Sequence, residues 1–64
     1  MNKFVKNLKF ILKSLNMTQK ELAKKLKVTN VTVSRWMMKL NSPSIATCEK
    51  IAKILGVQLS DLFE

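Results

Sequence analysis

The sequence is poor in the side chains from which catalytic and metal sites are built. It contains no histidine, no tyrosine and only four acidic residues, which are Glu21, Glu49, Asp61 and Glu64. General acid–base pairs, activated nucleophiles and most metal sites need groups that this set does not supply. The single cysteine, Cys48, excludes an internal disulfide and a zinc cluster, and a lone thiol is typical of the reducing cytoplasm. We therefore expect no enzyme, no metal and no cofactor.

Turn residues and long apolar runs are also scarce. Glycine and proline occur once each, fewer than a β-rich domain of this length needs, so the composition favours helices. No apolar run is long enough to cross a membrane, and lysines interrupt the apolar residues near the N-terminus, which argues against a signal peptide. With 64 residues, 47% of them hydrophobic, we expect one all-α domain over residues 1–64 with a single compact core.

The positive charge is concentrated in the first two-thirds of the chain. The formal net charge is +8. Residues 1–40 contain ten basic residues and one acidic residue, whereas residues 41–64 contain two basic and three acidic ones. This asymmetry indicates that the first part of the chain faces a polyanion such as nucleic acid. Lysines that only keep the surface solvated are the alternative interpretation.

The spacing of apolar residues predicts five short helices. They cover residues 3–15, 18–26, 29 to about 40, 44–55 and 58–63. The N-cap residues of the first four are Asn2, Thr18, Thr29 and Ser44. Glu21 follows Thr18 at the spacing of a capping box. Pro43 prevents the third helix from continuing, and Gly56 is suited to end the fourth.

Each of the first four helices has one apolar face, and we expect these faces to form the core. Their members are Phe4, Val5, Leu8, Ile11, Leu12, Leu15, Leu22, Ala23, Leu26, Val33, Trp36, Met37, Leu40, Ile45, Cys48, Ile51, Ala52 and Leu55. Phe10 does not fit this pattern, because it falls on the side of Lys3 and Lys6. It is either a contact patch or a scattered exposed apolar residue.

The segment from Gln19 to Met38 resembles the helix-turn-helix unit of the Cro/repressor family of phage and bacterial regulators. The residues that carry the resemblance are Gln19, Leu22, Ala23, Leu26, Val28, Thr29, Val33 and Trp36. Ala23 is small where the two helices cross, and the short turn fixes the angle of the second helix. Residues 43–44, 50–53 and 55–57 resemble the fourth helix of that family and its exit. The resemblance covers nearly the whole chain and implies a compact bundle of five short helices, a lambda-repressor-like DNA-binding domain.

The resemblance implies which residues meet DNA. The positions that face base edges in the family are occupied by Thr29, Asn30, Val31, Ser34 and Arg35. Arg35 can pair with guanine, although an ordinary exposed side chain is the alternative, and Asn30 can pair with adenine or a phosphate. The candidate phosphate contacts are Gln19, Lys27, Lys39 and Asn41. Gln19 is equally consistent with ordinary polarity at a helix start.

Five positions depart from the pattern of the family. Lys27 occupies the turn position where the family usually has glycine in a positive-φ conformation, which costs about 1 kcal/mol. Met37, Met38 and Lys39 replace the usual acidic residue, asparagine and glycine. The arginine that pairs with that acid in many members is replaced by Leu12, so we expect an apolar contact between Leu12 and Met37 in place of a buried ion pair.

The resemblance implies a sequence-specific regulator that binds double-stranded DNA, a Cro-like repressor of a phage or mobile element. It implies a homodimer on a palindromic operator, in the cytoplasm and associated with the nucleoid, without a small-molecule effector. The candidate dimer residues are Ile54, Leu59 and Phe63. Leu59 and Phe63 are equally suited to closing the core of the monomer.

Two other functions remain open. One is an antitoxin that binds a protein partner and also represses its own promoter, although no added neutralising segment is visible. The other is a membrane-surface peptide, since residues 3–15 are basic and amphipathic. The capped helices that follow and their shared core argue against the membrane interpretation, and lipid binding is not expected to depend on Arg35.

Overall fold

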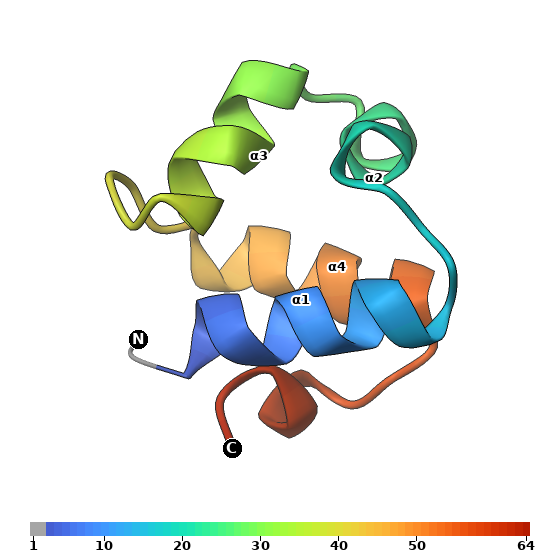
Figure 1. Cartoon of the computed structure of the whole chain (residues 1–64). Coiled ribbons are helices and arrows are strands. Elements are labelled where there is room, and N and C mark those ends of the chain that lie inside the picture. Colours follow the sequence, from blue (N-terminus) through green and yellow to red (C-terminus); the bar gives the residue numbers. More distant parts are fainter. Residues whose placement is uncertain (1–2) are drawn as a thin grey trace.

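A computed structural model describes residues 3–64 as an all-helical domain. It contains four α-helices and one short 3-10 helix: α1 (Phe4–Ser14), α2 (Gln19–Leu26), α3 (Asn30–Met37), α4 (Ile45–Leu55) and η1 (Leu59–Leu62). Helices α2 and α3 lie above α1 and α4, and η1 lies at the bottom (Figure 1). The all-α prediction is confirmed, but the fifth helix is a single 3-10 turn. Asn2 lies outside the described residues.

Side-chain hydroxyls start three of the helices as predicted. The Oγ atoms of Thr18, Thr29 and Ser44 accept hydrogen bonds of 3.1–3.2 Å from backbone N–H groups three residues later. The Glu21 carboxylate in turn accepts a bond of 3.1 Å from the Thr18 backbone N–H, which completes the capping box. The starts of these three helices could therefore be predicted from the local sequence alone.

All four α-helices end in the same left-handed turn. The residues with positive φ after α1 to α4 are Asn16 (54°), Lys27 (61°), Lys39 (63°) and Gly56 (71°). In each case the next residue donates a backbone hydrogen bond to the carbonyl five positions earlier: Met17 to Leu12, Val28 to Ala23, Leu40 to Arg35 and Val57 to Ala52. This pattern is the Schellman motif, which satisfies carbonyls that the helix end would leave unpaired.

The turn at Lys39 corrects two predictions about the third helix. Helix α3 ends at Met37 rather than near Leu40. The Leu40 side chain is 67% exposed instead of joining the core, because the left-handed turn rotates it away from the buried face of α3. The predicted loop before Pro43 is confirmed, and the proline itself is buried.

The core draws apolar side chains from all five elements. The buried set consists of Phe4, Val5, Leu8, Leu12, Leu22, Ala23, Val33, Trp36, Met37, Cys48, Ile51, Ala52, Leu55 and Leu62. The rings of Phe4 and Phe63 stack with centroids 6.0 Å apart, so the end of the chain packs against its beginning. Leu12 and Met37 both belong to this cluster, which is consistent with an apolar contact in place of the ion pair that many family members bury. Direct contact between the two side chains stays a prediction.

Some residues assigned to the apolar faces lie outside the core. Ile11 and Leu26 are partly buried at its edge. Leu15 and Ile45 are exposed, because one follows the end of α1 and the other is the first residue of α4. Phe10 is 71% exposed, as its position among the lysines predicted. Among residues 3–64, no helix has both the length and the apolar character needed to cross a membrane.

Candidate nucleic-acid interface

Helices α2 and α3 form a tightly packed pair at one edge of the domain. Only residues 27–29 connect them, and α2 packs more extensively on α3 than any other two elements pack on each other. Ala23 is buried, as expected for a small side chain at a close helix crossing. On α3, Val33, Trp36 and Met37 are also buried. One side of α3 is therefore fixed to the core, and the opposite side remains at the surface (Figure 1).

The surface side of α3 carries the side chains that the sequence assigned to base recognition. Asn30, Val31 and Arg35 are exposed, and Ser34 is partly exposed. Val31 is notable because an aliphatic side chain is 60% exposed in the first turn of a helix. Guanidinium, amide and methyl groups on one helix face are the chemistry that distinguishes base edges in the major groove. The outward placement is as predicted, and contact with DNA stays a prediction.

Thr29 has a local role that limits how it can meet a ligand. Its hydroxyl accepts a hydrogen bond of 3.2 Å from the Thr32 backbone N–H and lies 2.9 Å from the Thr32 hydroxyl. The Thr29 oxygen is therefore occupied in starting α3. Thr29 as a whole is exposed, so its methyl group can make an apolar contact such as one with a thymine methyl.

The candidate phosphate contacts lie before and after α3 and at the start of α2. Lys27 and Lys39 are exposed and occupy the two left-handed turns that flank α3. Asn41 is exposed, and its backbone N–H lies 3.5 Å from the Arg35 carbonyl oxygen, so the loop folds back over the end of α3. Gln19 is partly buried as the first residue of α2. Both cations thus sit on backbone fixed by helix termination.

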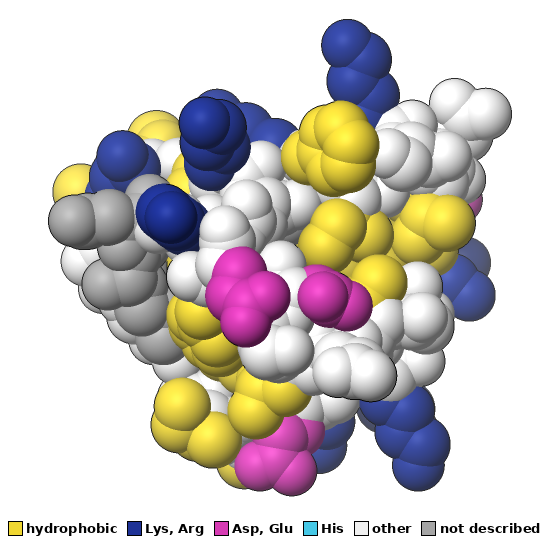
Figure 2. All heavy atoms as spheres, turned by 90° about the horizontal axis from the view of Figure 1, so that it is seen from below, with side chains coloured by type: hydrophobic (Ala, Val, Ile, Leu, Met, Phe, Trp, Pro, Cys, Tyr) yellow, Lys and Arg dark blue, Asp and Glu magenta, His cyan; other side chains and the backbone are white. Residues whose placement is uncertain are grey.

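The face below η1 differs in chemistry from the α3 edge. Acidic and hydrophobic side chains occupy the middle of this lower face, and lysines stand mainly toward its edges (Figure 2). Helix α3 lies on the other side of the domain (Figure 1). A polyanion is therefore better matched by the α3 edge than by the lower face.

The three candidate dimer residues all have contacts within their own chain. Ile54, Leu59 and Phe63 are partly buried and pack against the core. The stacking of Phe63 on Phe4 supports the alternative in which this side chain closes the monomer. A role for the three residues in a dimer stays a prediction.

The sequence did not reveal two features of the surface. Leu40 is an exposed hydrophobic residue next to the end of α3, where the expected longer helix had placed it in the core. A groove of about 290 Å³ between α2 and α4 is lined by Lys25, Leu26, Lys27, Lys50, Lys53 and Ile54. Its two halves are far apart in the chain, so no local spacing pattern could bring them together.

Comparisons with known proteins agree with this geometry. A family model described as helix-turn-helix matches residues 8–62, which include all of α2, α3 and α4. An uncharacterised HTH-type transcriptional regulator of Methanocaldococcus jannaschii is 42% identical over 48 residues, which are 75% of this chain and 73% of that protein. No solved structure gives a significant match.

Proposed function

The chain belongs to the helix-turn-helix family of Cro/repressor type, and we propose that it regulates transcription by binding double-stranded DNA through α3. The observation that carries this proposal is the two-sided character of α3. Its inner side is buried against the core, while Asn30, Val31 and Arg35 project from the outer side. A helix held rigidly by its inner side can place side chains against base edges in the major groove.

Each outer side chain has a different task in this proposal. Arg35 donates two parallel hydrogen bonds to a guanine, which is the pairing that best suits a guanidinium group. Asn30 pairs with an adenine or a neighbouring phosphate, and Ser34 supplies a smaller polar contact. Val31 and the Thr29 methyl group contact thymine methyls. Because Arg35 is the only arginine in the chain, its replacement gives the clearest test of base reading.

The lysines supply affinity that does not depend on sequence. Lys27 and Lys39, together with Gln19 and Asn41, contact phosphates on the two sides of the α3 edge. Each phosphate that a cation neutralises releases counterions, so binding weakens as salt is raised. The excess of basic residues in the first part of the chain supports such a contribution.

The finer proposal is a Cro-like repressor that occupies its operator as a homodimer. One α3 reads only a few base pairs, so a two-fold pair of domains on a palindromic site supplies the missing specificity. Occupancy of the site by the pair blocks RNA polymerase, without any catalytic step. Ile54, Leu59 and Phe63 are our candidates for the surface between the two copies, in a phage-encoded or mobile-element protein that acts at the nucleoid in the cytoplasm.

Selection from a randomised pool of duplexes tests this function. The wild-type chain and Arg35→Ala are selected side by side, and bound sequences are read. We expect a palindromic motif with half-site centres about 10 base pairs apart, in which Arg35→Ala relaxes one position of each half-site. If no sequence is enriched in the pool and the affinity for DNA depends only on salt concentration, the protein is not a sequence-specific regulator.

A further inference from the structure

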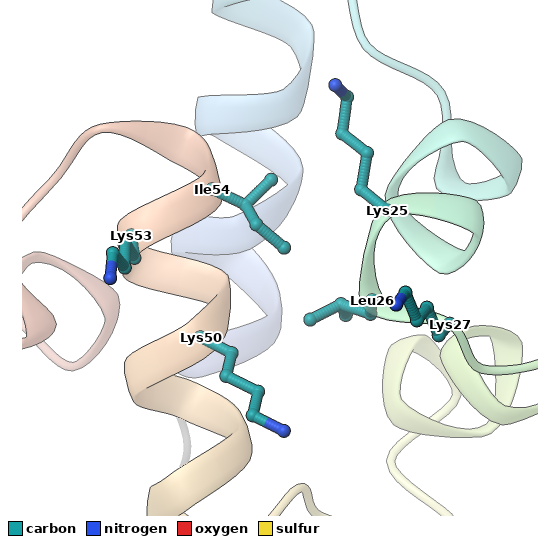
Figure 3. A pocket seen from close by; sticks show the side chains of 6 residues that line it. All are labelled: Lys25, Leu26, Lys27, Lys50, Lys53 and Ile54. Atoms are coloured by element: carbon teal, nitrogen blue, oxygen red, sulfur yellow. The ribbon is translucent and has the colours of Figure 1, made fainter.

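The groove between α2 and α4 brings together cations that base reading does not use. Lys25 and Lys27 stand on the α2 side, and Lys50 and Lys53 come from α4. In Figure 3, Leu26 and Ile54 point toward each other from the two helices, and Lys50 extends from α4 into the space between them. Lys53 extends on the other side of α4 in this view, so the groove has an apolar floor and a rim formed by the ammonium groups of Lys25, Lys27 and Lys50.

The cations of this groove have no carboxylate to neutralise them. Within residues 3–64, no lysine nitrogen lies within 4.0 Å of a carboxylate oxygen. Glu21 and Asp61 accept hydrogen bonds from the backbone N–H groups of Thr18 and Gln58. Glu49 directly precedes Lys50 in the sequence, and it forms no ion pair with any lysine or arginine of residues 3–64.

Helix carbonyls do not neutralise the lysines either. A lysine near the end of a helix often binds the last unpaired carbonyls. Here the backbone N–H groups of Lys27 and Val28 already donate to the Lys24 and Ala23 carbonyls, at 3.2 and 3.0 Å. The ammonium groups of Lys25 and Lys27 are left facing solvent, where they and the Lys50 ammonium group repel one another around one groove.

We propose that this groove binds a sugar-phosphate, with the phosphate held by Lys25, Lys27 and Lys50 and the sugar against Leu26. Lysine is a point-charge donor well suited to phosphate oxygens, and it needs no fixed planar geometry. A volume of about 290 Å³ suits a group of this size, since sites for larger organic ligands begin at about 300 Å³. The phosphate relieves the repulsion among the lysines.

Two sources can supply the sugar-phosphate. One is the backbone of a DNA duplex that extends past the α3 edge, and this source rests on the function proposed above. The other is a free nucleotide. Both present the same chemistry to the groove. The experiment therefore needs two arms, one with a free nucleotide and one with a DNA duplex.

The first arm uses deoxythymidine 3′,5′-bisphosphate as a free probe. The full chain is titrated while its backbone amides are followed by NMR. We expect saturable shifts at Leu26, Lys27 and Ile54. Replacing Lys25 and Lys50 together by glutamine should weaken binding about tenfold or more, since the charged hydrogen-bond donors to the phosphate are removed.

The second arm uses a DNA duplex of unselected sequence and measures how affinity falls with salt. The Lys25→Gln, Lys50→Gln variant should lower the slope of log affinity against log salt by about 0.9 for each phosphate that it no longer neutralises. The matched control is Lys6→Gln, Lys13→Gln, which removes the same charge from exposed positions of α1. The control should change neither the slope nor the affinity for the bisphosphate.

The outcomes of the two arms distinguish the sources. A response in the first arm alone supports a free nucleotide, because a groove that holds the DNA backbone would also change the salt slope in the second arm. A response in the second arm supports the DNA backbone, whether or not the bisphosphate also binds. If the amides of the groove do not shift and the two double variants change the salt slope equally, the groove is not a phosphate site. That result leaves the sequence preference of Arg35 untouched, so the proposed function can stand or fail separately.

Discussion

The backbone N–H of Leu40 donates a hydrogen bond of 2.9 Å to the carbonyl oxygen of Arg35. This bond ends α3 just after Arg35, the residue that we assign to guanine recognition. It requires Lys39 to adopt a left-handed conformation, with φ of 63°. The same arrangement joins Val28 to Ala23 across Lys27 at the end of α2. The helix that we propose to face DNA is thus bounded on both sides by lysines held in a conformation that favours glycine.

Replacing Lys27 by glycine should stabilise the domain. A side chain in the left-handed region costs about 1 kcal/mol relative to glycine, so we expect the free energy of unfolding in urea to rise by about that amount. Lys27→Gln is the control, because it removes the charge and keeps the unfavourable backbone conformation. A gain in Lys27→Gln equal to that in Lys27→Gly would show that charge, rather than backbone conformation, limits stability here.

Replacing Leu40 by serine should have little effect on stability. Its side chain is 67% exposed, so we expect a change in unfolding free energy of no more than about 0.5 kcal/mol. Leu22→Ala provides the contrast, because that side chain is fully buried and its truncation should cost about 2–5 kcal/mol. A loss above about 2 kcal/mol for Leu40→Ser would place Leu40 in the core.

The different outcomes for Thr18 and Leu40 show what the sequence could predict. The capping box at Thr18 and Glu21 depends only on residues three apart, and it is present as predicted. The end of α3 depends on a left-handed residue where the family usually has glycine, and the lysine at that position does not itself signal the conformation as Gly56 does for α4. The periodicity of the apolar residues therefore predicted a third helix that runs to about Leu40. In the structure the helix ends at Met37.

The same distinction applies to the surface residues: some could be predicted from local sequence, and others could not. Asn30, Val31 and Arg35 lie on one helix, so helical spacing was enough to predict that they face outward together. Lys25 and Lys50 come together only because α2 packs against α4. Nothing in the local pattern of either helix indicates that contact, so the groove could not be predicted from spacing.

Replacing Asn7 by leucine should stabilise the domain. The Asn7 Nδ2 atom is buried without a hydrogen-bond partner among the described residues. An unsatisfied buried donor is costly, so its replacement should raise the free energy of unfolding by about 1 kcal/mol. Asn41→Leu at an exposed loop position is the control and should change stability by less than about 0.5 kcal/mol. A loss of stability in Asn7→Leu would mean that the amide has a partner in solution.

The stability of the domain should fall at alkaline pH through Cys48. Burial raises the pKa of the Cys48 thiol above its ordinary value. The folded chain therefore holds this proton more tightly than the unfolded chain, whose thiol titrates at about pH 8.5. This stabilisation is complete below the unfolded pKa and is lost as pH rises through the folded pKa.

Urea unfolding at a series of pH values, for wild type and Cys48→Ala, checks this expectation. Lysines contribute equally to both curves, so the difference between the curves isolates the thiol. We expect the wild-type curve to fall more steeply above about pH 8.5. Parallel curves would show that the thiol titrates at the same pH in both states.

The most direct test of base reading by Arg35 is a comparison of affinities on two duplexes. One duplex carries the selected sequence, and the other has the guanine assigned to Arg35 replaced in each half-site. Wild type should prefer the first duplex by about 1–3 kcal/mol for each replaced guanine. Arg35→Lys keeps the charge and loses the paired donors, so it should bind unselected DNA as wild type does and lose most of this preference. An unchanged preference in Arg35→Lys would contradict the assignment of Arg35 and of the outer side of α3 as the surface that reads DNA.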